Sequence, residues 1–336
     1  MTDSYSILAA KYGYADSDRF KNILKLLMDA GEAEIVASLP ADIEELAKKW
    51  NKPAVEIDKM LAALYTKGVL FETRKGYQIA RGVVQFHDAT CSDRRSDEIY
   101  GRKLLDAWAD FGENEWYLDC VKEVKALPIF PSRVIPARGA IAENTNILPA
   151  EDINSLIGKA WKYAVVPCSC RRVHERCKRP VDVCLQLNKA AEYAIKRGTG
   201  KELNKKEALE LFDMAAGEGL VHTMPTIAIL STIICNCCPD CCVGVYPHKK
   251  YGEEKTSFDK SRFAAQVDQE SCSGCQDCAD ICPFEAIEMT QSPGSKKLKA
   301  AVNRDKCYGC GVCAVSCLPK CIKLIEVRPP EHIQEY

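Results

Sequence analysis

Residues 272–283 read Cys-Ser-Gly-Cys-Gln-Asp-Cys-Ala-Asp-Ile-Cys-Pro, and residues 307–317 read Cys-Tyr-Gly-Cys-Gly-Val-Cys-Ala-Val-Ser-Cys. Both stretches have the spacing C-x₂-C-x₂-C-x₃-C. In this spacing three thiolates of one tight loop reach the irons of one cubane cluster, and the fourth thiolate, at the start of a helix, points to another cluster. The sequence therefore predicts that the C-terminal part of the chain holds two 4Fe–4S clusters and transfers electrons.

The segment from Phe263 to Val327 resembles the bacterial ferredoxins with two 4Fe–4S clusters. Pro283 follows Cys282 as in that family, and the glycines within the two motifs let each loop bend tightly and direct backbone N–H groups at sulfur. By position, the resemblance implies two ligand sets, which we call the first thiol set (Cys272, Cys275, Cys278 and Cys317) and the second thiol set (Cys307, Cys310, Cys313 and Cys282).

The second motif departs from the family pattern at two positions. Leu318 follows Cys317 where a proline is usual, and Cys321 stands at the position that corresponds to Ala286 in the first motif. Because a small buried residue belongs at that position, we expect Cys321 to fill the core and not to act as a ligand.

The overall composition is that of a soluble protein in a reducing compartment. The 336 residues carry a formal net charge of −1, so composition gives no general attraction to nucleic acid or to an anionic membrane. The longest apolar run, Ile227–Cys235, is about half of a membrane span, and the first residues lack a secretory signal. Twenty cysteines without an export signal indicate metal ligands in place of disulfides. We expect a cytoplasmic protein of an anaerobic cell.

Nine further cysteines form two groups in the middle of the chain and are candidate metal ligands. The first group is Cys168, Cys170, Cys177 and Cys184, and the second group is Cys235, Cys237, Cys238, Cys241 and Cys242. One additional 4Fe–4S cluster could take ligands from both groups, or each group could hold a cluster of its own. Zinc, which also binds four thiolates, and reactive or disulfide-forming thiols remain as alternatives.

The first group is interrupted by a strongly basic stretch. Residues 171–179 contain Arg171, Arg172, Arg176, Lys178 and Arg179. These cations would offset the negative charge of a thiolate-ligated cluster or dock an acidic electron partner, and a solvated basic face is the alternative. His174, within this stretch, is expected to be a surface residue and not a ligand.

The pattern of apolar residues predicts an α+β, multidomain chain with four segments. Residues 1–90 are expected to form a winged-helix-like domain, with helices at Phe20–Ala30, Ile43–Trp50 and Val55–Lys67 and a hairpin of Val69–Phe71 and Tyr77–Ile79. Residues 91–139 are expected to be a helical connector that ends in an extended stretch from Leu127 to Ala137. Residues 140–260 are expected to be a central α/β Cys-rich domain, with strand-like runs at Tyr163–Val166 and Thr226–Ile234 and helices at Leu185–Arg197 and Lys205–Ala216, and residues 261–336 the ferredoxin-like domain.

The layout as a whole resembles multi-cluster ferredoxin-type proteins of anaerobic bacteria and archaea, most of which lack an assigned activity. No flavin or nicotinamide fingerprint is apparent in the sequence. We therefore expect an electron-transfer subunit or carrier with a flavin- or metal-containing oxidoreductase as its redox partner. A cluster-based reductase that acts at the central cysteines is the first alternative.

A redox-sensing DNA-binding regulator is the second alternative. Residues 1–90 contain 12 basic and 13 acidic residues, and the candidate recognition helix over residues 54–67 has two of each. Because DNA binding requires an excess of Lys and Arg along the helix that enters the groove, this balance favours protein docking over nucleic-acid binding.

Overall fold

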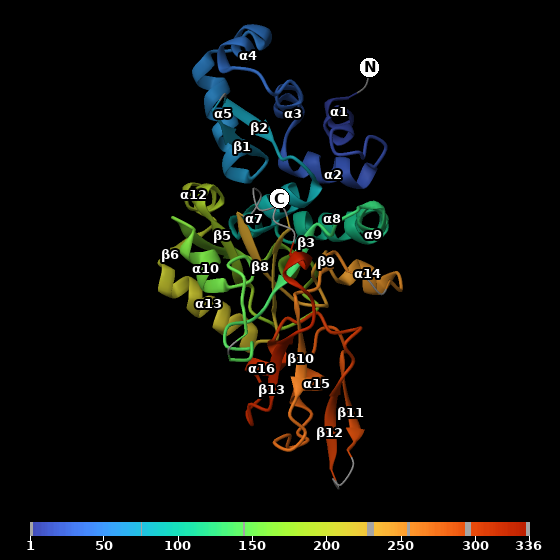
Figure 1. Ribbon diagram of the computed structural model, residues 1–336. Coiled ribbons are helices and arrows are strands. Elements are labelled where there is room, and N and C mark those ends of the chain that lie inside the picture. The colour runs from blue at the N-terminus through green and yellow to red at the C-terminus, as the bar shows by residue number, and fades with distance from the viewer. Residues whose placement is uncertain are drawn as a thin grey trace. The chain divides into compact units, whose positions relative to one another are not determined.

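The computed structural model describes residues 3–74, 76–143, 145–226, 232–253, 256–292 and 297–333 (Figure 1). The chain divides into two compact units. Unit 1 comprises residues 1–117 together with Pro167–Glu175, and unit 2 comprises residues 118–166 and 176–336. The mixture of 43% helix and 19% strand agrees with the predicted α+β class and a multidomain chain. In the described ranges, the structure contains no helix that is both long and apolar enough to span a membrane.

Unit 1 is mainly helical. One short hairpin, β1 (Leu70–Thr73) with β2 (Gly76–Ile79), is antiparallel and pairs Leu70 with Ile79. The helical elements are α1 (Ser4–Ala10), α2 (Asp18–Leu27), α3 (Ala30–Ala37), α4 (Ile43–Trp50), α5 (Ala54–Lys67), α6 (Val83–Cys91), α7 (Arg95–Tyr100), α8 (Lys103–Phe111), the π-helix η1 (Gly112–Trp116) and α11 (Ser169–His174).

Several sequence predictions for this unit are confirmed at the level of single elements. Helices α4 and α5 and the hairpin lie where they were expected, although Lys75 of the predicted turn is outside the described residues. The predicted helix Phe20–Ala30 is wrong at its end. Met28 is extended, and Asp29 caps a new helix, α3, through a capping box with Glu32, so the chain turns three residues early. The winged-helix assignment itself stays a prediction.

An aromatic core holds unit 1 together. The Phe20 ring lies 5.0 Å from that of Phe111 and 6.2 Å from that of Trp108, and Phe86 lies 5.6 Å from Trp108. These side chains come from α2, α6 and α8 and are at most 1% exposed. Because large aromatic side chains contribute most to core burial, this contact fixes the helices of the predicted N-terminal segment to those of the predicted connector.

Unit 2 is built on a seven-stranded sheet with the strand order β6-β4-β5-β8-β7-β3-β9 (Figure 1). Antiparallel pairing joins β5 with β8, β8 with β7, and β7 with β3, whereas β9 is parallel to β3. The strands are β3 (Ser132–Ile135), β4 (Tyr163–Pro167), β5 (Asp182–Leu187), β6 (Lys201–Leu203), β7 (Val221–Pro225), β8 (Ile233–Cys237) and β9 (Phe258–Asp259). The helices of this part are α9 (Tyr117–Ala126), α10 (Ile153–Gly158), α12 (Asn188–Arg197), α13 (Lys205–Gly217) and α14 (Tyr246–Lys250).

One prediction in this region requires correction. The predicted helix Leu185–Arg197 begins three residues late, because Val183, Leu185 and Leu187 alternate as the buried side of strand β5. The predicted stretch Leu127–Ala137 is extended over β3, which is also a strand of the sheet. Of the predicted run Thr226–Ile234, residues 227–231 lie outside the described residues, and its end forms the start of β8.

The two faces of the sheet have different coverings. On one face, Leu185 and Ile234 pack with Phe212 of α13 and Ile157 of α10. On the other face, Cys235 and Cys237 of β8 contribute to an apolar cluster that does not include these two helices. Alternation along β8 thus directs the cysteines away from the helix-covered face.

The ferredoxin-like part follows the sheet. Strand β10 (Phe263–Val267) pairs antiparallel with β13 (Ile322–Glu326), and β11 (Ile287–Gln291) pairs with β12 (Leu298–Val302). Two one-turn helices, α15 (Asp277–Asp280) and α16 (Val312–Val315), each follow one cysteine loop, and a short 3₁₀ turn, η3 (Pro330–His332), follows β13. The backbone N–H of Leu324 donates to the carbonyl of Ala140, so the segment before α10 is attached to β13.

Candidate functional site

The two thiol sets line two separate cavities in the ferredoxin-like part. The cavity of the first thiol set is lined by all four of its cysteines, with Met289 and Ala300 among the other lining residues. The cavity of the second thiol set is lined by all four of its cysteines, with Ala286 and Leu324. The structure therefore brings together each set of four thiols that the resemblance to the ferredoxins implied, including the fourth cysteine from the opposite motif.

Left-handed backbone conformations shape both loops. Gly274 has φ +75° and Gly309 has φ +66°, and a Cβ atom at either position would lie 2.4 Å or less from a backbone oxygen. Before each one-turn helix the chain is left-handed again, at Gln276 with φ +76° and at Gly311 with φ +80°. Glycine is required at residues 274 and 309 for both conformation and space, since no other residue avoids the close contact.

Thiols this close together ionise less readily than isolated ones unless a cation compensates for the negative charge of their thiolates. Burial raises the pKa of Cys310 to about 12, and burial with the neighbouring thiols of its set raises the pKa of Cys278 to about 11. Burial raises the pKa of the Cys272 thiol, but hydrogen bonds from the backbone N–H groups of Ala300 and Gly274 outweigh burial and hold this pKa below its usual value. Four convergent soft sulfur ligands with backbone donors suit an iron–sulfur cluster, whose irons would supply the missing positive charge.

Cys321 lies at the edge of the first cavity. Its Sγ is 3.4 Å from the Sγ of Cys317, and its side chain is 7% exposed. The first cavity is thus lined by five thiols, whereas Ala286 lines the second cavity at the corresponding position.

A third group of thiols lies in the central part of unit 2. The Sγ of Cys177 is 3.8 Å from that of Cys238 and 4.0 Å from that of Cys241, and the three ligand atoms lie within 4.8 Å of one another. Cys177 comes from the first central group, and Cys238 and Cys241 come from the second. We call these residues the central trio. Their proximity favours the hypothesis that both groups contribute to one site.

The surroundings of the central trio are basic. The guanidinium of Arg176 lies 3.8 Å from the ring centroid of Tyr246 and donates to the carbonyl of Asp240, and Arg179 forms an ion pair of 2.8 Å with the Asp240 carboxylate. The hydrogen bond to Cys238 and burial raise the pKa of the Cys241 thiol. Arg176 and Arg179 thereby hold the 238–241 loop and place positive charge next to its sulfurs.

Four more central cysteines lie in or just beyond the sheet. Hydrogen bonds with Cys184 of β5 and Cys237, together with burial, raise the pKa of the Cys235 thiol well above its ordinary value. The amide of Gln186 donates to Cys184 over 3.4 Å, and the Thr223 hydroxyl lies 3.5 Å from the sulfur of Cys237. Cys242 accepts from the N–H of Gly244 over 3.4 Å. The cysteines from the strand are therefore held by partners that the sequence alone did not indicate.

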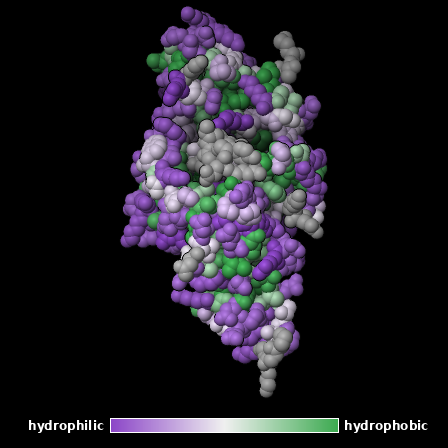
Figure 2. All heavy atoms as spheres, viewed as in Figure 1, coloured by the Kyte–Doolittle hydropathy of each residue, from purple (hydrophilic) through white to green (hydrophobic). Residues whose placement is uncertain are grey.

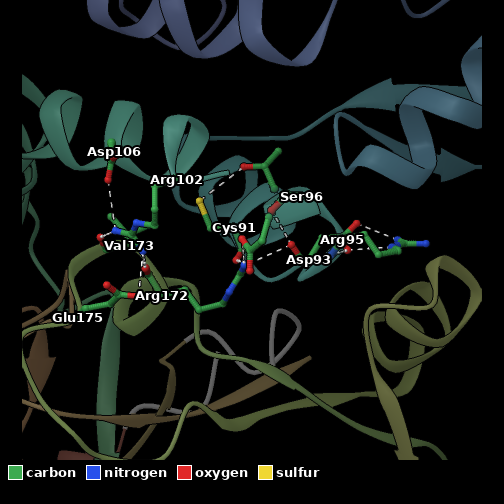
Figure 3. Close-up of polar contacts among 11 residues, drawn as sticks. Cys91, Asp93, Arg95, Ser96, Arg102, Asp106, Arg172, Val173 and Glu175 are labelled. Carbon is green, nitrogen blue, oxygen red and sulfur yellow. Dashed lines mark hydrogen bonds and ion pairs between the residues drawn. The ribbon is translucent and has the colours of Figure 1, made fainter. Parts of the chain in front are cut away.

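The segment with Cys168 and Cys170 belongs to unit 1, where α11 packs against α6 and α8. Arg172, 6% exposed, donates to the carbonyls of Cys91 and Asp93 (Figure 3). It also forms an ion pair with Asp97. Arg102 donates to the carbonyl of Arg172 and to that of Val173 over 2.8 and 3.0 Å (Figure 3).

The alternative of a solvated basic face over residues 171–179 is wrong for the first part of that stretch. Arg171 is 2% exposed, and Arg172 is taken up within unit 1 by the carbonyls at the end of α6 and by the Asp97 carboxylate. His174, which was expected at the surface, is half-buried, and its imidazole is hydrogen-bonded to the hydroxyl of Tyr117. Carbonyl groups at helix ends attract such cations, and this explains how α11 is held.

Comparison with known proteins agrees with the geometry of the C-terminal part. Residues 271–321 match the 4Fe–4S dicluster domain family. A stretch of 81 residues is 28% identical to a protein of Proteus vulgaris named as a probable iron–sulfur subunit of the Frd operon, and it corresponds to 24% of this chain and 47% of the relative. The chain therefore matches about half the length of that relative. Residues 271–321 form a 4Fe–4S dicluster domain, and the chain is an iron–sulfur protein.

Proposed function

We propose that this protein transfers electrons through two 4Fe–4S clusters, one held by each thiol set. Cys272, Cys275, Cys278 and Cys317 would hold one cluster, and Cys307, Cys310, Cys313 and Cys282 the other. When bound, such clusters supply reversible one-electron oxidation and reduction. The observation that supports this most directly is that each set of four thiols lines a single cavity within the matched dicluster domain.

The proposal includes a third site at the central trio. The cysteines of the dicluster domain leave Cys177, Cys238 and Cys241 unused, and these three sulfurs lie within 4.8 Å of one another. This spacing suits one tetrahedral ion, so the three side chains would turn outward to bind the separate irons of a cubane. In a chain that already binds iron–sulfur clusters we expect a further cluster here in place of zinc. Arg176 and Arg179 would offset its negative charge.

The partner is proposed to be a flavin- or metal-containing oxidoreductase, with this chain as its electron-transfer subunit or carrier. The Proteus vulgaris relative is named as a probable iron–sulfur subunit, which is compatible with such a role. The predicted winged-helix-like segment would dock protein in this arrangement, since its acidic and basic residues balance. A cytoplasmic location and an anaerobic host remain predictions from the sequence.

A second candidate function follows from the number of thiols in the central trio. A cubane cluster has four irons, and three cysteine ligands leave one iron for a non-cysteine ligand or a substrate. This observation supports the alternative of a reductase that acts at the central site. Turnover of a substrate by the isolated reduced protein would favour the reductase over the electron carrier.

The test is anaerobic quantitation of iron and acid-labile sulfide, combined with EPR spectroscopy of the reduced protein. Two clusters predict about 8 Fe per chain, and a third cluster predicts about 12 Fe per chain, at four irons per cubane. A value near zero, with zinc present, would refute the proposed electron transfer. A value of about 8 would retain the two thiol sets and refute a central cluster.

A further inference from the structure

The two thiol sets have the same spacing but opposite environments. In the loop of the second set every residue from Cys307 to Ala314 is buried. In the loop of the first set, Ser271, Ser273, Gln276 and Asp277 are exposed, and so is Cys275 itself. The cysteine spacing is the same in both loops, but the exposed polar pair Gln276 and Asp277 of the first loop stands where the second loop has the buried Gly311 and Val312.

Residues of the central sheet and its loops cover the second thiol set. Cys310 belongs to an apolar cluster that also contains Cys237 and Cys242 of the central group. Val134 of β3, Val221 of β7, Val245 and Phe258 are also members of that cluster. The carbonyl of Cys310 accepts from the N–H of Ala137 over 2.9 Å. One apolar cluster therefore joins this set to Cys237 and Cys242, and Cys242 is the chain neighbour of Cys241 in the central trio.

An aromatic pair lies within the same region. The rings of Phe284 and Tyr308 stack at 4.0 Å with an interplanar angle of 17°. Tyr308 follows Cys307 and Phe284 lies two residues after Cys282, so each ring is next to a cysteine of the second thiol set. Both rings pack in the cluster that contains Cys242. On the neighbouring surface, Lys249 forms an ion pair with Glu285 and so joins α14 to this segment.

The first thiol set is accompanied by exposed apolar side chains. Leu318, the residue that replaces the usual proline after Cys317, is 86% exposed. Leu298, whose carbonyl lies against Gly274, is 48% exposed, and Val315 of α16 is 38% exposed. The space-filling view shows apolar residues at the surface in this C-terminal part (Figure 2). Exposed apolar residues around an accessible thiol are features of a contact surface.

We propose that the two thiol sets differ in role: the first set exchanges electrons with a protein partner, and the second set connects to the central trio through Phe284, Tyr308 and Cys242. This inference rests on the proposed function. The partner would be a one-electron carrier protein with an apolar patch at its own redox centre. Each exchange moves one electron, so the partner is oxidised as this chain is reduced, or the reverse, and no covalent bond changes.

The proposed order of electron transfer, from the partner through the first thiol set and the second thiol set to the central trio or the reverse, can be tested by EPR spectroscopy. The full-length protein is prepared anaerobically and reduced with dithionite. We compare the variants Cys275→Ser and Cys310→Ser, which are matched because each replaces one ligand with a harder oxygen that makes its own site more difficult to reduce. The readout is the microwave power at half-saturation of the signal from the central site. A nearby reduced cluster accelerates the relaxation of that signal.

We expect Cys310→Ser to lower the half-saturation power at least threefold and Cys275→Ser to leave it within a factor of about 1.5. The reverse pattern, or equal effects of the two variants, would overturn the proposed order. About 8 Fe per chain in the unmodified protein would instead identify failure of the central-cluster proposal, and the order would fail with it.

If Cys310→Ser does not fold, the unmodified protein gives a second measurement. A dysprosium chelate in solution should broaden the signal of the first thiol set and leave the signal of the second set unchanged. Equal broadening of both signals would refute the difference in exposure on which the order depends.

Discussion

Arg262 is fully buried at the junction between the central sheet and the ferredoxin-like part, and its removal should be costly. Its Nε lies 2.9 Å from Oε2 of Glu151, which is 1% exposed, and its Nη1 lies 2.9 Å from the carboxylate of Glu326. Its Nη2 donates to the carbonyl of Asn146 over 2.7 Å. Arg262 therefore ties residues 146–151 to the first strand of the ferredoxin-like part.

In Arg262→Met the Glu151 carboxylate would stay buried without its cation. Breaking a buried pair by removing one partner destabilises a protein by about 3–5 kcal/mol. Glu326 should add less than about 1 kcal/mol, since its side chain is 38% exposed and water can replace the cation. We therefore expect Arg262→Met to lower the free energy of unfolding of unit 2 by about 3–5 kcal/mol.

The double variant Arg262→Met with Glu151→Leu supplies the control, because it removes both buried charges together. Replacement of a buried pair by apolar residues is often neutral, so the double variant should cost about 2 kcal/mol or less. The assay is anaerobic guanidinium unfolding followed by far-UV circular dichroism, with iron absorbance recorded in parallel. The reasoning would be refuted if Arg262→Met lowered the free energy of unfolding by less than about 1 kcal/mol. It would also be refuted if the loss in the double variant equalled the sum of the losses in Arg262→Met and Glu151→Leu measured separately.

Three other predictions test single features of unit 2. Cys177→Ala should lower the iron content by about four irons per chain, the content of one cubane. Cys120→Ala, which changes a cysteine outside the thiol groups named above, should keep the full iron content. Equal iron contents in the two variants would contradict the central site. Gly309→Ala should destabilise the protein more than Gly139→Ala. Both residues have a left-handed backbone, but of the two only residue 309 lacks space for a Cβ atom. Denaturation midpoints in the reverse order would count against the loop geometry. Burial lowers the pKa of His222 to about 4, below the usual 6.5, so the unfolded chain binds the proton first as pH falls. The free energy of unfolding should therefore fall by about 1.3 kcal/mol between pH 7.5 and 5.5. This fall should be absent in His222→Gln, and an unchanged pH dependence in that variant would exclude His222 as its source.

Three ligands of each set could be predicted from sequence because they share one loop, whereas the fourth, from the opposite motif, was implied by the resemblance to the bacterial ferredoxins. The spacing within each motif sets which thiols share a loop, and the structure places all eight cysteines of the two sets in two cavities. The central site is less predictable, since Cys177 lies 61 residues before Cys238 and only the fold brings them together. Strand β5 was missed for a local reason, because its alternation continues directly into the helix that follows.

Burial of charged residues was hardest to predict. Five cations in nine residues are compatible with a solvated face, yet Arg172 is buried because the carbonyls at the end of α6 need a donor. Those carbonyls lie 79 to 81 residues away in the sequence. Basic composition identifies the donor but not the acceptor, so no property of the stretch itself could show that Arg172 is buried.

The same reasoning explains how twin motifs can acquire different roles. The cysteine spacing is identical in both motifs, so it fixes how each cluster is coordinated and gives no information about the direction of electron transfer. Direction depends on what packs outside each loop: Val134, Phe258 and the 237–245 segment cover the second set, whereas Cys275 of the first set stays exposed. A ferredoxin-like domain acquires an internal end and an external end once one of its loops is built into a neighbouring sheet. We therefore expect substitutions at Leu318 to weaken exchange with a partner protein without altering reduction by dithionite, since a small reductant does not need a docking surface.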